Sequence, residues 1–238
     1  GTPRQATVVS ACPYFKDEYA TRWAEHDPDE ANALLDGIGL TERDAEGFRL
    51  RPDGTPLSIV VEYALVFGPW RDVVTMMCEQ WKDIGIRGIP KEEDRTLWAQ
   101  RGAAGERDCG VWTMDRSFTP FAFPTWYTLG IEGDGRANKY YQWYASKGAE
   151  GDEPPEEVQA QYVLYDRIKA ATPAELPALA EEFFDNASQA LWYIGTVGEL
   201  PHVGVVKNNF RNVPEKAISD TIQMTPGNTA VEQYFWRQ

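Results

Sequence analysis

The sequence has few of the residues that nucleophilic or metal-dependent chemistry requires. It contains two histidines, and its three cysteines have neither CxxC spacing nor a histidine at ligand spacing, so neither a zinc site nor a disulfide framework is indicated. The motifs GxGxxG, GxxxxGK[ST], GxSxG and HExxH are also absent. We therefore expect no catalytic residue, no metal and no cofactor.

Basic residues are also scarce. Lys and Arg number 23 against 37 Asp and Glu, which gives a net charge of -14. Nucleic-acid binding needs clustered Lys and Arg, so the charge excludes nucleic acid as a partner. No apolar run approaches the roughly 18 residues of a membrane span.

Aromatic residues, in contrast, are abundant. They make up 13% of the chain and include nine Trp. Because large rings occur both in cores and at binding surfaces, we expect most of these Trp in the core and roughly two to four at a ligand.

The first half of the chain alternates strand and helix patterns. Asp27 and Pro28 begin a helix that ends at Gly37 or Gly39. The expected elements that follow are a strand over 57–66, a helix over 70–84, a strand over 86–90, a helix over 94–103 and a strand over 108–114. This alternation predicts an α/β fold with largely parallel strand pairing.

The second half begins with a polar, acidic loop over 146–157. A helix is expected from Pro154 and Pro155 to about Ala171, and the capping box of Thr172 and Glu175 begins the next one. The patterns LWYIGTVG and HVGVVKNN predict strands over 191–198 and 202–209. The final residues, 225–238, show no periodicity.

Several segments in order resemble the extracellular solute-binding proteins of family 5, the oligopeptide- and dipeptide-binding type receptors of ABC importers. The segments are DPDEANALLDGIGL, GFRLRPDGTPLSIVVEYA, VVTMMCEQWKDIGI, IGTVGELPHVGVVKNNFRNVPE and EQYFW. Together they extend from about Tyr19 to Trp236. The order of the segments, rather than any one of them, carries the resemblance.

The resemblance implies the C-terminal lobe of a two-lobed periplasmic binding protein of type II, cluster C-like, with a mixed sheet flanked by helices. Residues 1–206 would form the ligand-binding lobe, and residues 207–238 would return to an N-terminal lobe beyond this sequence. The implied protein is a monomeric receptor, periplasmic or extracytoplasmic, with a lipid anchor as an option. It would close on an oligopeptide or oligosaccharide, with hinge strands near Val203 to Lys207 and near the N-terminus, and deliver it to an ABC permease.

Peptide-binding members of this family carry a strand that ends in Trp, two residues and Asp, where the Asp pairs with the peptide's α-amino group. Trp112 and Asp115 match that pattern. Residues three apart on a regular strand face opposite sides, so both reach one site only if the strand ends or bends at Met114. The prolines at 120 and 124 supply such a break. Asp115 would then lie at the carboxyl end of a parallel strand, where α/β sheets bind ligands.

Each candidate also has a structural alternative. Trp112 fits a core ring, and Asp115 fits a turn-capping carboxylate. Phe118, Phe121, Trp126 and Tyr127 either line the cleft or fill the core, and Arg116 is a candidate for a peptide carboxylate. A carbohydrate-active hydrolase and a stand-alone carbohydrate-binding domain are the alternative functions.

Overall fold

The computed structural model describes residues 1–114, 117–122, 124–130, 138–219 and 222–237. Its contacts divide the chain into two compact units. Unit 1 comprises residues 1–25, 114–128 and 155–238, and unit 2 comprises residues 26–113 and 129–154. The chain therefore leaves unit 2 directly after Thr113, beside the predicted site.

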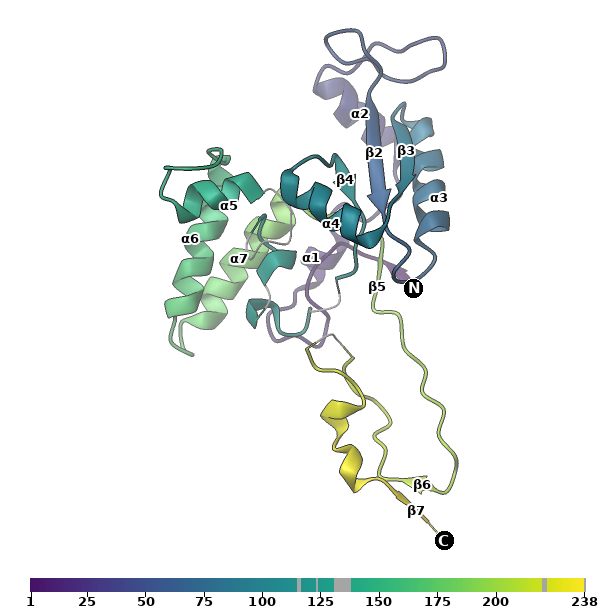
Figure 1. Cartoon of the computed structure of the whole chain (residues 1–238), viewed down its shortest axis with the longest axis vertical. Coiled ribbons are helices and arrows are strands. Elements are labelled where there is room, and N and C mark those ends of the chain that lie inside the picture. The colour runs from purple at the N-terminus through teal and green to yellow at the C-terminus, as the bar shows by residue number, and fades with distance from the viewer. Residues whose placement is uncertain (115–116, 123, 131–137, 220–221, 238) are drawn as a thin grey trace. The chain divides into compact units, whose positions relative to one another are not determined.

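Unit 2 is built on a three-stranded parallel sheet (Figure 1). Its strands are β2 (Ser58–Tyr63), β3 (Arg87–Glu92) and β4 (Cys109–Gly110), in the order β3-β2-β4. Helices α3 (Trp70–Asp83) and α4 (Arg95–Ala104) connect them. This confirms the expected alternation of strands and helices with parallel pairing.

The two connecting helices cover opposite faces of the sheet. Val61 and Tyr63 pack on Val74 and Cys78 of α3. Glu62, between them in sequence, faces α4, because neighbouring side chains on a strand point to opposite faces. Gly88 of β3 allows α3 to approach closely, since a Cβ there would lie 2.8 Å from the Cβ of Cys78.

The remaining helices of unit 2 are α2 (Pro28–Gly37) and α5 (Asn138–Ala145). Asp27 caps α2 as predicted, its carboxylate accepting a hydrogen bond of 2.9 Å from the Glu30 amide. The buried Arg49 joins α2 to the end of α3, because it donates to Asp36 at 2.5 Å and to the Ile84 carbonyl at 2.8 Å.

The regular structure of unit 1 is mainly helical. Helices α1 (Asp17–Thr21), α6 (Glu156–Ala170) and α7 (Leu176–Ala190) accompany the antiparallel pair β1 (Thr2–Pro3) and β5 (Val197–Gly198). Glu175 accepts a hydrogen bond from the Thr172 amide at 2.9 Å, which confirms the capping box. The helices pack around buried aromatic rings, and the buried Gln161 donates to the carbonyls of Tyr127 and Phe183.

Short elements complete unit 1. They are the 3-10 helices η1 (Pro120–Ala122), η2 (Pro124–Trp126), η4 (Gly227–Thr229) and η5 (Val231–Gln233), and the antiparallel pair β6 (Phe210–Arg211) and β7 (Phe235–Trp236). Among the described residues, the parallel pairing therefore occurs in the unit 2 sheet and the antiparallel pairing in the two small sheets of unit 1. The predicted boundary between residues 206 and 207 concerns docking to another lobe and stays a prediction.

Three predicted strands were too long, and a fourth does not form. β2 ends at Tyr63, where its pairing with β3 ends, rather than at residue 66. β4 pairs only over Cys109 and Gly110 rather than 108–114, and β5 covers only Val197 and Gly198 rather than 191–198. The segment 202–206 forms no strand, and its valines are exposed. An apolar alternating sequence needs a neighbouring strand for its backbone groups, and the described residues offer none there.

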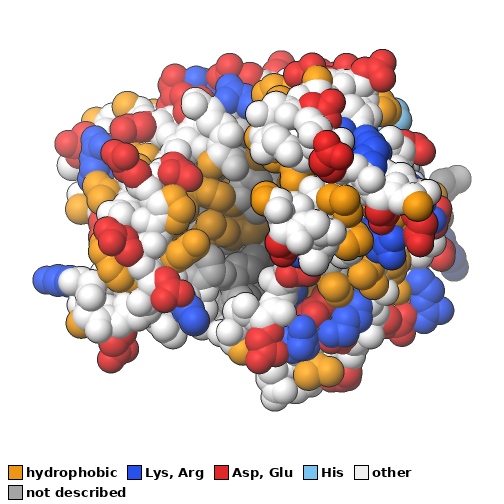
Figure 2. Space-filling view, turned by 90° about the horizontal axis from the view of Figure 1, so that it is seen from above, with side chains coloured by type: hydrophobic (Ala, Val, Ile, Leu, Met, Phe, Trp, Pro, Cys, Tyr) orange, Lys and Arg blue, Asp and Glu red, His pale blue; other side chains and the backbone are white. Residues whose placement is uncertain are grey.

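Acidic side chains are spread over the face in Figure 2 and are interspersed with Lys and Arg. Within the described ranges, no helix is long and apolar enough to cross a membrane. The same residues contain no group of three or more His, Cys, Asp or Glu side chains arranged to hold a metal ion.

Candidate functional site

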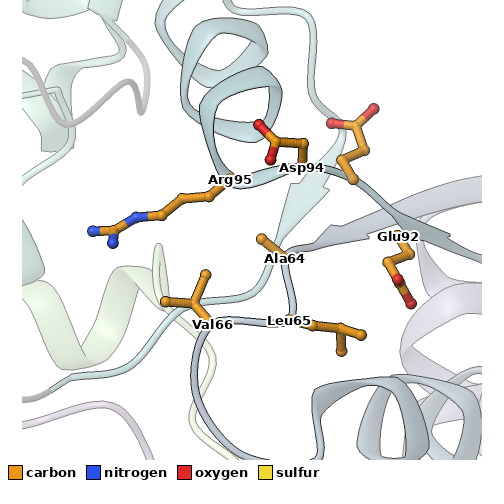
Figure 3. A pocket seen from close by; sticks show the side chains of 7 residues that line it. Ala64, Leu65, Val66, Glu92, Asp94 and Arg95 are labelled. Atoms are coloured by element: carbon orange, nitrogen blue, oxygen red, sulfur yellow. The ribbon is translucent and has the colours of Figure 1, made fainter.

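A pocket of about 400 Å³ lies at the carboxyl edge of the unit 2 sheet (Figure 3). Its lining consists of Ala64, Leu65, Val66, Glu92, Glu93, Asp94 and Arg95. These residues follow β2, end β3 and begin α4. Open α/β sheets bind ligands at the carboxyl ends of parallel strands, so the pocket has the position expected of a ligand site.

Four aromatic side chains at the same edge form a cluster, called here the ring cluster: Phe67, Trp70, Trp98 and Trp112. Trp112 follows β4 and stacks on Trp98, with ring centroids 4.7 Å apart and planes inclined by 24°. Phe67 meets Trp112 edge-on at 5.9 Å, and Trp70 lies 5.6 Å from it. One ring thus comes from each of four segments: the turn after β2, the start of α3, helix α4 and the segment after β4.

Burial within the ring cluster is graded. Trp98 is buried and donates its indole N–H to the Glu62 carbonyl at 3.2 Å, whereas Trp112 is half-buried and Phe67 is 47% exposed. The Arg107 guanidinium lies 3.8 Å from the centre of the Trp98 ring. Since Arg107 and Trp112 cannot share one face of Trp98 at these distances, Trp98 lies between them. The cluster therefore has an anchored inner ring and accessible outer rings.

Buried charges hold α4 against the sheet. Only 1% of the Glu62 side chain is exposed, and it pairs with Arg101 at 2.9 Å and Lys91 at 3.2 Å. Burial raises the pKa of Glu62, but the hydrogen bonds from Arg101 and Lys91 outweigh burial and hold that pKa below its ordinary value. The carboxylate therefore stays ionised and fixes the helix that carries Trp98.

The other acids at this edge also have partners. Glu93 pairs with Lys91 at 2.6 Å, and Glu92 pairs with Arg71 at 2.5 Å. The Asp94 carboxylate accepts a hydrogen bond of 2.8 Å from the Thr96 amide, and this bond lowers the pKa of Asp94. The three carboxylates therefore serve ion pairs and a helix cap within the unit.

Residues 1–134 match the family model described as "Bacterial extracellular solute-binding proteins, family 5 Middle". The chain belongs to this family. The match covers more than half of the sequence and includes all three strands of the unit 2 sheet. It confirms the family resemblance found in the sequence.

Solved structures and a curated relative agree with this family 5 assignment. The oligopeptide-binding protein OppA is 37% identical, with a TM-score of 0.82 over 100% of this chain and 40% of its own. The periplasmic alpha-galactoside-binding protein of Rhizobium meliloti (strain 1021) is 25% identical over 207 residues, which is 85% of this chain and 29% of that protein.

A third match, MelB from Agrobacterium fabrum in complex with stachyose, shares the fold at 15% identity, with a TM-score of 0.66. The match covers 82% of this chain and 30% of that one. The family 5 chain therefore spans well under half the length of these relatives. Together the matches confirm the α/β lobe fold predicted from the sequence.

The residues predicted for the site lie in different parts of the family 5 chain. Trp112 belongs to the ring cluster of unit 2, whereas Asp115 and Arg116 lie outside the described residues. Phe118 is half-buried in unit 1, where Trp126 and Tyr127 are buried. Tyr127 packs edge-on against Phe184 at 5.1 Å, which fits the core alternative. As ligand contacts, all six residues stay predictions.

Sequence reasoning missed Phe67, Trp70, Trp98 and Arg95 as neighbours of Trp112. A signal was available, because FGPW begins four residues after the end of β2 and DRTLW begins two residues after the end of β3. Carboxyl ends of parallel strands meet at one edge, so the rule applied to Asp115 also applied to these segments.

Proposed function

We propose that this chain forms the C-terminal lobe of an extracytoplasmic receptor that binds an oligosaccharide or oligopeptide and delivers it to an ABC permease. The receptor would be a monomer that closes its two lobes on the solute, with no chemical step. A periplasmic location, or a lipid anchor in the full-length protein, is part of the same proposal.

Family membership and the names of the relatives support this function. OppA is named for oligopeptides, the Rhizobium meliloti protein for alpha-galactosides, and MelB was solved with stachyose. All are binding proteins by name, which favours a receptor over a hydrolase. The residues of the site must then select among solutes of these kinds.

The observation that carries the proposal is the ring cluster beside the pocket at the carboxyl edge of the sheet. A half-buried Trp112 on an anchored Trp98 presents apolar ring surface, and the pocket adjoins the turn that carries Phe67. Such a surface stacks on the apolar faces of sugar rings or packs against peptide side chains. The density of Trp favours an oligosaccharide.

The direct test is native mass spectrometry of the full-length protein, which would detect a co-purified solute. We expect an oligosaccharide, while a ladder of peptide masses would identify an oligopeptide receptor instead. Turnover of a glycoside, abolished by a single carboxylate substitution, would contradict the receptor function and support the hydrolase.

Substitution of Trp112 tests the site itself. In the full-length protein, Trp112→Ala should weaken solute binding in titration calorimetry about ten-fold or more, because a central aromatic contact is lost. Trp81→Ala is the matched control, since Trp81 packs on the core from the far end of α3. Equal affinities for the two variants would place Trp112 in the core only.

Asp115 is tested in the same way. Asp115→Ala should weaken binding by about ten-fold if its carboxylate pairs with the solute. Unchanged affinity with a lower urea midpoint would assign Asp115 to a turn cap.

A further inference from the structure

Arg95 differs from the other cations at the carboxyl edge of the sheet. Lys91, Arg101, Arg107 and Arg71 all lie within ion-pair distance of Glu62, Glu93 or Glu92. Arg95 is exposed, lines the pocket, and forms no ion pair or side-chain hydrogen bond with any residue that the structure describes. Its charge is therefore available to a molecule that enters the pocket.

The position of Arg95 is unfavourable for the helix that carries it. Arg95 is the first residue of α4, and the positive end of a helix dipole disfavours a cation there. Asp94 does not compensate by pairing, because its carboxylate caps the Thr96 amide. Figure 3 shows the Arg95 side chain extending away from the carboxylates of Asp94 and Glu92. Helix stability thus does not explain an arginine at this position.

The guanidinium of Arg95 instead lies against the ring cluster. Its central carbon is 5.5 Å from the centre of the Trp112 ring. A cation over an indole face is held weakly, by about 0.5–1 kcal/mol at an exposed site, and keeps its N–H donors. Arg95 is therefore placed beside Trp112 while its hydrogen-bonding capacity remains available.

We propose that Arg95 is a specificity-determining residue that binds a carboxylate group of the solute while Trp112 contacts the adjoining part. The planar guanidinium matches a carboxylate with two parallel hydrogen bonds, a geometry that a neutral hydroxyl does not reproduce. Glu92 and Glu93 are paired with Arg71 and Lys91, and the Asp94 carboxylate is engaged by the Thr96 amide, so none of the three forms an ion pair with Arg95. This inference rests on the proposed receptor function and narrows it to acidic solutes.

A carboxylate of this kind comes either from a uronic acid in an oligosaccharide or from a peptide terminus. Titration calorimetry of the full-length receptor with two probe pairs separates these sources: trigalacturonate against its methyl ester, and trialanine against its amide. We expect the dissociation constant of the acidic member of one pair to be at least about ten-fold lower than that of its neutral partner. The pair that shows this preference identifies the source.

Variants then assign the preference to Arg95. Arg95→Gln should bind the acidic and neutral probes equally, and Arg95→Lys should retain part of the preference because it keeps the charge without the planar fork. The matched control is Arg51→Gln, which removes an exposed cation that donates to the Ser58 carbonyl at the amino end of β2. It should keep the wild-type preference.

Several results would overturn the inference. Equal binding of acidic and neutral probes by the wild type, or an unchanged preference in Arg95→Gln, would show that Arg95 does not select a carboxylate. If no probe binds, the co-purified solute is the test. An acidic solute whose binding depends on Arg95 supports the inference, whereas a neutral solute overturns the inference and leaves the proposed receptor function intact. A receptor that binds neither probe nor solute would refute the proposed function together with the inference.

Discussion

The chain contains two aromatic clusters that differ in burial and in neighbours. The ring cluster of unit 2 ranges from the buried Trp98 to the 47% exposed Phe67. It borders a pocket in which the Arg95 guanidinium forms no ion pair with any described side chain. The aromatic core of unit 1 consists of Tyr19, Phe121, Tyr127, Phe183 and Phe184. Within it, Phe183 and Phe184 are at most 1% exposed.

This comparison shows what aromatic density means in this chain. Rings that meet edge-on in a helical core contribute stability through burial, whereas rings at the carboxyl edge of a parallel sheet remain partly accessible. Composition counts both kinds equally. Exposure and place in the fold separate ligand surface from core.

The largest expected effect is on the aromatic core of unit 1. Phe183→Ala should lower the free energy of unfolding by about 3–5 kcal/mol, because the side chain is fully buried and a cavity would remain. Urea unfolding of the full-length protein measures this. The matched variant Phe67→Ala should change the urea midpoint little and weaken solute binding. Similar losses of stability in both variants would make the ring cluster a second core.

Glu62 provides the next test, because it separates a buried ion pair from an exposed one on the same arginine. Glu62→Gln should lower the free energy of unfolding by about 3 kcal/mol, since it leaves Arg101 facing a buried neutral group. Glu106 pairs with Arg101 at 3.1 Å at the surface, and Glu106→Gln should have a much smaller effect. Equal urea midpoints for the two variants would show that burial adds nothing to this pair.

The pH dependence of stability follows from the same carboxylate. The pKa of Glu62 in the folded chain lies below its ordinary value of 4.5, so at acidic pH the unfolded chain binds more protons. The stabilisation is present above the ordinary value and is lost as the pH falls through the lowered pKa. The difference in urea midpoint between wild type and Glu62→Gln should therefore shrink from about pH 7 to about pH 3. A constant difference would contradict this.

Much of unit 2 could be predicted from the sequence, because local signals agreed with the tertiary structure. Asp27 capped α2, the apolar spacing of α3 matched its buried face, and the alternation of elements gave a parallel sheet. The strand expected over 202–209 was wrong, because alternating valines specify a strand only where a partner strand exists.

The candidate site was predicted only in part. Trp112 was found because it matched a short motif, but its neighbours come from segments up to 45 residues away, counted from Phe67 to Trp112. Arg95 carries no motif at all. Its role depends on the pairing of every other cation around it, which is a property of the folded arrangement and not of local sequence.

The smallest expected effects come from substitutions at the two ends of α4. They compare the end of the helix at the pocket with the end far from it. Gly105 adopts φ +71 at the carboxyl end, with open space where a Cβ would lie, so Gly105→Ala should lower stability by about 1 kcal/mol through backbone strain alone. Asp94→Ala removes the cap beside Arg95 and should also lower the urea midpoint slightly. Only Asp94→Ala should weaken solute binding, because the first turn positions Arg95 over Trp112. Calorimetry of both variants at matched folded fraction measures this difference, and equal affinities would separate the helix start from ligand recognition.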